Sequence, residues 1–246
     1  MNDLRLLTKK TSDPRVFDTY WMTGLIQKGR VRVTVPAQKD AQTAAELSAA
    51  QYLLSEKNVC GHNKAGAGLR IWVSRGAIRK LLRGISDNDR MSPYANFLLT
   101  RYLGAQVEVE NQDTSWADER CETQVDIMDV QGPAMTTIEV NGFGLVELTG
   151  HAVARYIEHF KRQPERAWRE IVEIAKEVKP AIIKGRKSIH DLQHRNKGRY
   201  AMDAKRGVLL TIADPDKPGM LPSLVTIMIP DDRAAYAECH KTDSQC

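Results

Sequence analysis

The stretch of this 246-residue sequence that most constrains its fold lies between residues 42 and 54. Apolar residues recur there at Ala44, Leu47, Ala50 and Leu54, close to the three- and four-residue spacing of one helix face. The segment therefore predicts a helix with one side packed against a core, and the neighbouring segments must supply the rest of that core.

Glu46 lies near the start of this helix, beside its apolar side. Two interpretations are open. With Thr43 it forms a Thr-x-x-Glu pattern, which is typical of a capping box that satisfies the first helical turn. Alternatively, its carboxylate faces a site that is shared with acidic residues from other elements.

The segments around the helix form an ordered set. Before it, residues 15–20 make a short apolar run that contains Asp18, and residues 30–35 alternate between polar and apolar side chains. After it, residues 68–78 predict a strand that runs through Ser74 into a helix. Residues 1–13 are polar and are expected to form an arm or an added strand, and Lys28-Gly29 is expected to be a turn.

This order resembles the ribonuclease H family, which begins with an acid ending the first strand and continues through a hairpin to a helix with an Ala-Glu-Leu-x-Ala-Ala core. The closest matches are Ala-Glu-Leu-Ser-Ala-Ala at residues 45–50 and Glu-Arg-Cys-Glu at residues 119–122. The resemblance covers residues 14–128. It implies a ribonuclease H-like domain, in which a mixed sheet is flanked by helices.

The resemblance also implies a metal-dependent site. Two Mg²⁺ or Mn²⁺ ions would be held by Asp18, Glu46 and Glu122, and Ser74 stands at the family's third acid position. Two such ions, about 4 Å apart, activate a water and stabilise the leaving oxygen of a phosphodiester. Ser74 is a poor ligand for Mg²⁺, which prefers carboxylate oxygens. Gln112 falls where many members of the family carry a mobile His. The site is therefore either catalytically active or retained only for binding.

Composition narrows the class of protein. The chain has no apolar run long enough to span a bilayer and begins without the apolar centre of a signal peptide. Its four cysteines are scattered and form no C-x-x-C pair. We therefore expect a reduced cytoplasmic protein rather than a disulfide framework or a zinc protein.

Positive charge is concentrated in residues 179–206, which contain nine basic and two acidic residues. Such a block is typical of a contact with a phosphate backbone, although a solvated basic surface gives the same pattern. The candidate nucleic-acid-binding residues in and around this block are Lys184, Arg186, Lys187, Arg195, Lys197, Arg199 and Tyr200.

Gln131-Gly132-Pro133 predicts a domain boundary, which divides the chain into residues 1–130 and 131–246. The second part reads as two strands, two helices and two further strands, so the overall prediction is a mixed α/β fold with a ribonuclease H-like domain followed by a smaller α+β domain. This part is faintly similar to small RelE-like and barnase-like ribonucleases.

Three functions follow from these features. The leading hypothesis is a metal-dependent nuclease that acts on RNA or an RNA/DNA hybrid. The alternative is a catalytically inactive ribonuclease H-like protein that binds nucleic acid or acts as a protein-interaction adaptor. A further alternative is a metal-independent ribonuclease in the second part, for which the candidate residues are His151, Arg155, Arg195, Arg199 and Tyr200.

Overall fold

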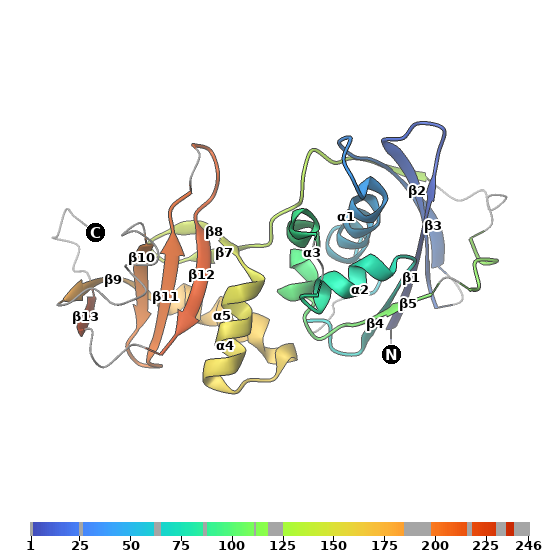
Figure 1. Cartoon of the computed structure of the whole chain (residues 1–246). Helices are drawn as coiled ribbons and strands as arrows, with labels where there is room; N and C mark the ends of the chain where they lie inside the picture. The colour runs from blue at the N-terminus through green and yellow to red at the C-terminus, as the bar shows by residue number, and fades with distance from the viewer. Residues whose placement is uncertain are drawn as a thin grey trace. The chain divides into compact units, whose positions relative to one another are not determined.

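The computed structural model describes residues 2–24, 27–61, 65–85, 88–110, 112–117, 125–184, 198–215, 218–229 and 235–238. The chain has a mixed α/β fold and divides into two compact units, Met1–Ala134 and Met135–Cys246 (Figure 1). The predicted boundary after residue 130 and this division both lie in the segment that joins the last strand of the first unit to the first strand of the second.

The first unit carries one mixed sheet and its helices. Its elements are β1 (Asn2–Lys10), β2 (Val16–Thr23), β3 (Gln27–Thr34), α1 (Ala41–Ser55), β4 (Leu69–Val73), α2 (Gly76–Leu82), a 3-10 turn (Asp89–Met91), α3 (Ser92–Leu99), β5 (Gln106–Val109) and β6 (Val125–Asp129). The strand order is β5-β4-β1-β2-β3-β6. Strands β1, β2 and β3 are antiparallel neighbours, whereas β4 is parallel to β1, β5 to β4 and β6 to β3. The three helices pack on one side of this sheet (Figure 1).

The first strand of the sheet is β1, in the segment that was expected to be an arm or an added strand. Leu4, Leu6 and Thr8 point into the core and are buried, while Arg5 and Leu7 between them point to the other face. Because buried and solvent-facing residues alternate, the average composition of the segment is polar. The segment is nevertheless an inner strand of the sheet, which pairs with β2 on one side and with β4 on the other. Consequently Asp18 lies in the second strand and not in the first.

Strands β2 and β3 form one hairpin, and the expected turn at Lys28-Gly29 is wrong. Both residues lie inside β3, where Gly29 pairs with Trp21. A Cβ atom at Gly29 would come within 2.8 Å of the Trp21 indole ring. Glycine is therefore needed here for the close approach of a large ring to the backbone.

Helix α1 confirms the predicted helix, with Ala44, Leu47, Ala50 and Leu54 all buried in the core. Its N-cap is Asp40, which has a left-handed backbone conformation with φ 66°. Thr43 therefore lies inside the helix rather than at its cap. The capping-box interpretation of Glu46 is wrong, because the carboxylate contacts another element.

The second unit has a seven-stranded sheet and two helices among its described residues. Its elements are β7 (Thr137–Val140), β8 (Gly144–Leu148), α4 (Gly150–Phe160), α5 (Pro164–Glu177), β9 (Lys179–Lys184), β10 (Gly198–Asp203), β11 (Val208–Ala213), β12 (Ser223–Met228) and β13 (Ala235–Glu238). The strand order is β13-β9-β10-β11-β12-β8-β7, in which β12 and β8 are parallel and the other pairs antiparallel.

Replacing Gly66 by Ala tests the packing of the first unit. Gly66 has φ +89°, and a Cβ atom there would lie 2.4 Å from the backbone nitrogen of Ala105 and 2.6 Å from the carbonyl oxygen of Tyr102. Because the backbone cannot move away cheaply, we expect the free energy of unfolding to fall by about 2 kcal/mol or more. Urea unfolding followed by tryptophan fluorescence measures this loss of stability, since three of the four tryptophans lie in this unit.

Gly76→Ala is the matched control. A Cβ atom at Gly76 meets nothing within 4 Å, and the residue begins α2. The control is expected to leave the free energy of unfolding unchanged or to raise it by up to about 1 kcal/mol. Equal midpoints for the two variants would contradict the described contact.

Candidate functional site

The sheet of the first unit separates the predicted site residues onto two faces. Successive side chains of a strand point to opposite faces. In β2, Phe17 and Trp21 belong to the core beneath the helices, so Asp18 and Tyr20 point the other way. We call this second side the open face because the helices of this unit pack on the other one, although Asp18 and Tyr20 themselves are buried. The open-face side chains used below are Arg5 and Lys9 of β1, Asp18, Tyr20 and Met22 of β2, Lys28, Arg30 and Arg32 of β3, Trp72 of β4, and Val125 and Ile127 of β6.

On the helix side, the carboxylate of Glu46 joins α1 to the end of β4. Glu46 is fully buried, and Ser74 directly follows β4. The backbone N–H of Ser74 donates to Oε1 of Glu46 at 2.6 Å, and the Ser74 hydroxyl donates to Oε2 at 2.5 Å. Both carboxylate oxygens of Glu46 are therefore engaged by one residue of the neighbouring strand end.

Two buried threonines complete this group, which we call the Glu46 cluster (Thr8, Thr19, Glu46 and Ser74). The hydroxyls of Thr8 and Thr19 lie 3.0 Å apart across β1 and β2. Gln42 of α1 donates from Nε2 to the carbonyl oxygen of Thr8 at 2.6 Å. Hydrogen bonds thus join the helix to three adjacent strands at this point of the core.

Burial raises the pKa of Glu46, because the core disfavours the charged carboxylate. The hydrogen bonds from Ser74 and Thr8 and the charge of Arg75 act in the opposite direction, but the effect of burial is larger. The group therefore retains its proton to a higher pH than an exposed glutamate does. Such a carboxyl is suited to a structural hydrogen-bonded junction.

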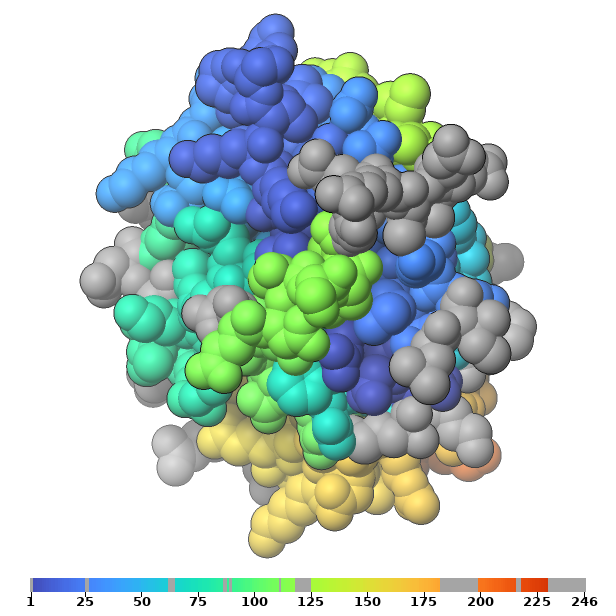
Figure 2. Space-filling view, turned by 90° about the vertical axis from the view of Figure 1, so that its right-hand side faces the viewer, coloured from blue at the N-terminus to red at the C-terminus, as the bar shows by residue number. Residues whose placement is uncertain are grey.

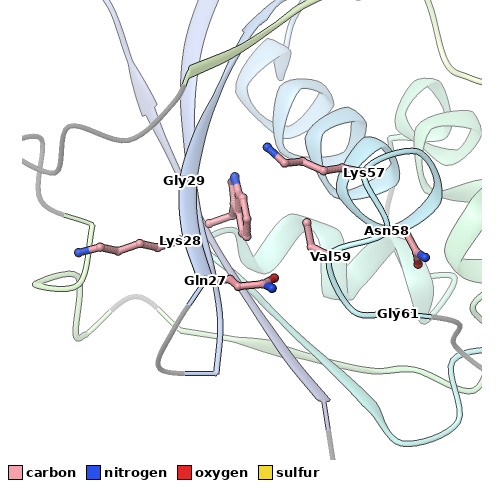
Figure 3. A pocket seen from close by; sticks show the side chains of 8 residues that line it. Gln27, Lys28, Gly29, Lys57, Asn58, Val59 and Gly61 are labelled. Carbon is pink, nitrogen blue, oxygen red and sulfur yellow. The ribbon is translucent and has the colours of Figure 1, made fainter.

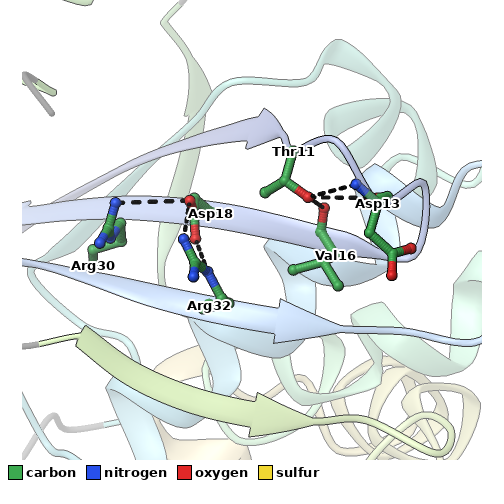
Figure 4. A network of polar contacts seen from close by, with 6 residues as sticks. All are labelled: Thr11, Asp13, Val16, Asp18, Arg30 and Arg32. Carbon is green, nitrogen blue, oxygen red and sulfur yellow. Dashed lines mark hydrogen bonds and ion pairs between the residues drawn. The ribbon is translucent and has the colours of Figure 1, made fainter.

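Asp18 lies on the open face in a bidentate ion pair. Arg32 of β3, directly opposite in the register, donates from Nε to Oδ1 at 2.8 Å and from Nη2 to Oδ2 at 3.0 Å. Nη1 of Arg30 lies 3.7 Å from the same carboxylate (Figure 4). Asp18 and Glu46, two of the three predicted metal ligands, thus lie on opposite faces of the sheet and cannot share an ion.

The structure describes only some of the remaining residues that the sequence connects with the metal site. Glu122 lies outside the described residues, and Gln112 is exposed. Within the part of the chain that the structure describes, no three His, Cys, Asp or Glu side chains come together in a way that could hold a metal ion.

Most of the predicted nucleic-acid-binding residues of the second unit are not described. Arg186, Lys187, Arg195 and Lys197 and the side chain of Lys184 fall outside the described residues. Arg199 is exposed, pairs with Asp214 at 2.7 Å and stacks on Phe143 at 5.1 Å from the ring centroid. Tyr200 is buried with Ala181 and Leu209, so its ring is part of a small core.

Two of the candidates for a metal-independent ribonuclease, His151 and Arg155, lie on α4. His151 is exposed at the second residue of this helix. Arg155 forms an ion pair with Glu158, one turn further along, at 2.8 Å. These contacts are those of a solvated helix surface.

A pocket of about 630 Å³ lies between the β2–β3 hairpin and the segment that follows α1 (Figure 3). Lys57 and Val59 point toward the sheet there, whereas Lys28 points away (Figure 3). Lys57 forms an ion pair with Asp126 and lies 5.2 Å from the centroid of the Trp21 ring. The lining residues are Trp21, Gln27, Lys28, Gly29, Lys57, Asn58, Val59 and Gly61, which include two lysines and no carboxylate.

The open face carries cations next to aromatic rings. Nζ of Lys9 lies 5.0 Å and the guanidinium of Arg30 lies 5.9 Å from the centroid of the Tyr20 ring. Lys9 also donates to the carbonyl oxygen of Ala117 at 3.3 Å, so the segment after β5 crosses over β1. Figure 2 views the first unit from this side, where the blue strands and the green segment after β5 form the surface.

Neither Thr8 nor the basic row of β3 was predicted as functional from the sequence. A signal for the row was available, since Arg30 and Arg32 alternate with valines in a predicted strand and must share one face. No comparable signal exists for Thr8, whose position next to Glu46 depends on how β1 pairs with β4.

Comparisons with family models, with curated proteins and with solved structures find no match to this chain. Among the described residues, none of the helices combines the length and the apolar character needed to cross a membrane.

Replacing Glu46 by Gln tests the buried carboxyl. Because the pKa of Glu46 is raised in the folded protein, its titration favours folding at acid pH, and this contribution is lost as the pH rises from the ordinary carboxyl range through the folded-state pKa. Gln does not titrate. The free energy of unfolding of Glu46→Gln, measured relative to wild type in urea, should therefore increase across this window and level off above it.

Glu56→Gln, at an exposed residue just after α1, serves as the control and should show a much smaller trend. A difference between Glu46→Gln and wild type that is independent of pH, or that falls as the pH rises, would contradict the assigned environment of Glu46.

Proposed function

We propose that the protein is a nucleic-acid-binding adaptor whose first unit is a ribonuclease H-like domain without hydrolytic activity. The observation that carries this proposal is the placement of the two acids. Glu46 is buried and bonded to Ser74, and Asp18 is paired with Arg32 on the opposite face of the sheet. Neither carboxylate is available to hold an ion for phosphodiester hydrolysis.

The order of elements in the first unit supports a ribonuclease H-like domain. Three antiparallel strands are followed by α1, then by β4 parallel to β1 and β5 parallel to β4. This is the order that the sequence resemblance implies, provided that β1 replaces β2 as the first strand. The residue of the first strand that neighbours Glu46 is then Thr8, and the residue that ends β4 is Ser74. Two hydroxyls would thus stand where the family has carboxylates.

The chemistry of these donors argues against two-metal hydrolysis. Mg²⁺ needs several oxygen ligands in near-octahedral geometry and is usually held by carboxylates. The neighbours of Glu46 that affect its titration are Ser74, Thr8 and Arg75, and none of them is an acid. A single buried carboxyl, already bonded through both oxygens, is a poor ligand for either of two divalent ions.

The charge of the chain supports a nucleic-acid partner. The sequence has a formal net charge of +5 and a pI near 9.0. Residues 185–197 of the basic block lie outside the described residues, but β3 of the first unit places further cations on the open face. RNA or an RNA/DNA hybrid is the partner that the family resemblance suggests, and phosphate contacts from lysine and arginine would supply most of the affinity.

The first prediction of this proposal is binding without cleavage. Labelled RNA and RNA/DNA hybrid, incubated with the protein in Mg²⁺, in Mn²⁺ and in chelator, should remain intact while a shifted complex forms. The affinity should fall about tenfold or more between 50 mM and 200 mM salt. Asp18→Asn should leave the substrates equally intact.

Cutting that requires metal and disappears in Asp18→Asn or Glu46→Gln would instead establish a metal-dependent nuclease. Cutting that survives chelator and is lost in His151→Ala would establish a ribonuclease in the second unit. Either result would overturn the proposal.

The second prediction is that carboxylates can be restored to the Glu46 cluster. In Thr8→Asp/Ser74→Asp, three acids would meet in the core, so the variant should be less stable than wild type in chelator. Mn²⁺ should raise its melting temperature, because an ion present at 100 times its Kd contributes about 2.7 kcal/mol to the folded state.

Thr8→Asn/Ser74→Asn has the same side-chain shapes without the charges and is the matched control. It should not respond to Mn²⁺, and neither should wild type. A folded aspartate variant that shows no Mn²⁺-dependent stabilisation would contradict the assignment of the cluster to the family's metal position.

A further inference from the structure

Three cationic side chains form a row along β3 on the open face. Lys28, Arg30 and Arg32 occupy alternate positions, so they point to the same side and are spaced by about 7 Å. The side chain of Arg32 is 44% exposed and that of Arg30 is 26% exposed. The row therefore offers positive charge to solvent at regular intervals along an extended strand.

Asp18 is the acid that directly faces this row, and it orients the guanidinium groups (Figure 4). Its bidentate contact uses two N–H donors of Arg32. A guanidinium has five donors in a fixed plane, so Arg32 keeps donors for a further acceptor. Arg30 and Arg32 share this one carboxylate, so the two guanidinium groups together keep a net positive charge.

Apolar side chains lie directly beside the row, on β6. The parallel register pairs Arg32 with Ile127 and Arg30 with Val125, at a strand separation of about 4.8 Å. Ile127 is 80% exposed, the highest value among the large apolar side chains of the described residues. Half-buried Val125 and exposed Ile127 thus lie beside the cations on the same face, and the exposed Asp129 follows them at the end of β6.

We propose that this two-strand strip (Lys28, Arg30, Arg32, Val125 and Ile127) binds single-stranded nucleic acid. The inference rests on the proposed function and names the surface and the kind of nucleic acid. Phosphates would contact the cations of β3, and the bases would lie against the apolar side chains of β6.

The chemistry of the strip favours a single strand over other anionic partners. An extended nucleic-acid strand presents one phosphate and one flat, partly apolar base in each repeat, which matches the two parallel rows. In a duplex the bases are stacked inside and cannot reach the side chains of a flat sheet. An acidic peptide supplies the negative charges but has no flat group in each repeat.

The test is fluorescence anisotropy with a short labelled uridine oligonucleotide, over a range of salt concentrations. Lys28→Gln/Arg32→Gln removes two charges from the row and should weaken binding about tenfold or more. It should also reduce the slope of log K against log salt by about 1.4, since each phosphate contact on a single strand contributes about 0.7. The melting temperature of each variant shows that it is folded.

Arg79→Gln/Lys80→Gln on α2 is the matched control, because it removes the same charge from the helix side of the same unit. It should change the affinity less than about twofold and leave the salt slope almost unchanged. Ile127→Asn tests the apolar row separately. It should weaken binding about threefold without changing the slope, because only contacts with phosphate are strongly salt-dependent.

The outcomes separate this inference from the proposed function. If wild type binds and the row variant binds equally well, the strip is not the site, and the proposed function stands through another surface. If wild type binds no nucleic acid, both fail. If duplex RNA or an acidic peptide displaces the oligonucleotide more effectively than unlabelled oligonucleotide does, the assignment to a single strand is wrong.

Discussion

The contact between Glu46 and Ser74 is the interaction on which the rest of the first unit depends. It joins the start of α1 to the end of β4 inside the core and satisfies both oxygens of a buried carboxyl. An unsatisfied carboxyl in this position would be costly, so the hydrogen bonds fix where the helix lies against the sheet. The same bonds remove Glu46 from ion binding. One contact therefore supports both the packing of the domain and the proposed loss of hydrolysis.

The two faces of the sheet have different roles, since one packs against the helices and the other is proposed to bind nucleic acid. On its helix side, Thr8, Thr19 and Glu46 are buried and Ser74 is half-buried; on its open face, cations alternate along β3 beside Val125 and Ile127 of β6. Asp18 belongs to the open face, where it orients arginines instead of holding a metal ion. The proposed function follows this division, because a nucleic acid that binds to the open face never reaches the carboxyl of Glu46.

The elements with a clear helical or hairpin pattern could be predicted from the sequence. Helix α1 has the expected position, and the two strands and two helices expected at the start of the second unit are β7, β8, α4 and α5. For the first strand the sequence predicts only an arm or an added strand, because Asp3, Arg5 and Lys9 hide the alternation of Leu4 and Leu6 in the composition. The face to which Asp18 points is set by pairing between strands that are distant in sequence. Local patterns carry no information on such pairing, so two acids with the expected spacing were assigned to one site.

The central claim is that a single strand of nucleic acid binds to the open face while the carboxyl of Glu46 remains buried on the other side of the sheet. Photocrosslinking of a 4-thiouridine oligonucleotide to the protein, followed by mass spectrometry of the peptides, tests it most directly. The account predicts crosslinks in the peptides that contain β3 and β6, and none at the start of α1 or at Ser74. Crosslinks confined to Ser74 and the start of α1 would place the oligonucleotide over the position of the family's catalytic residues, which would contradict binding at the open face.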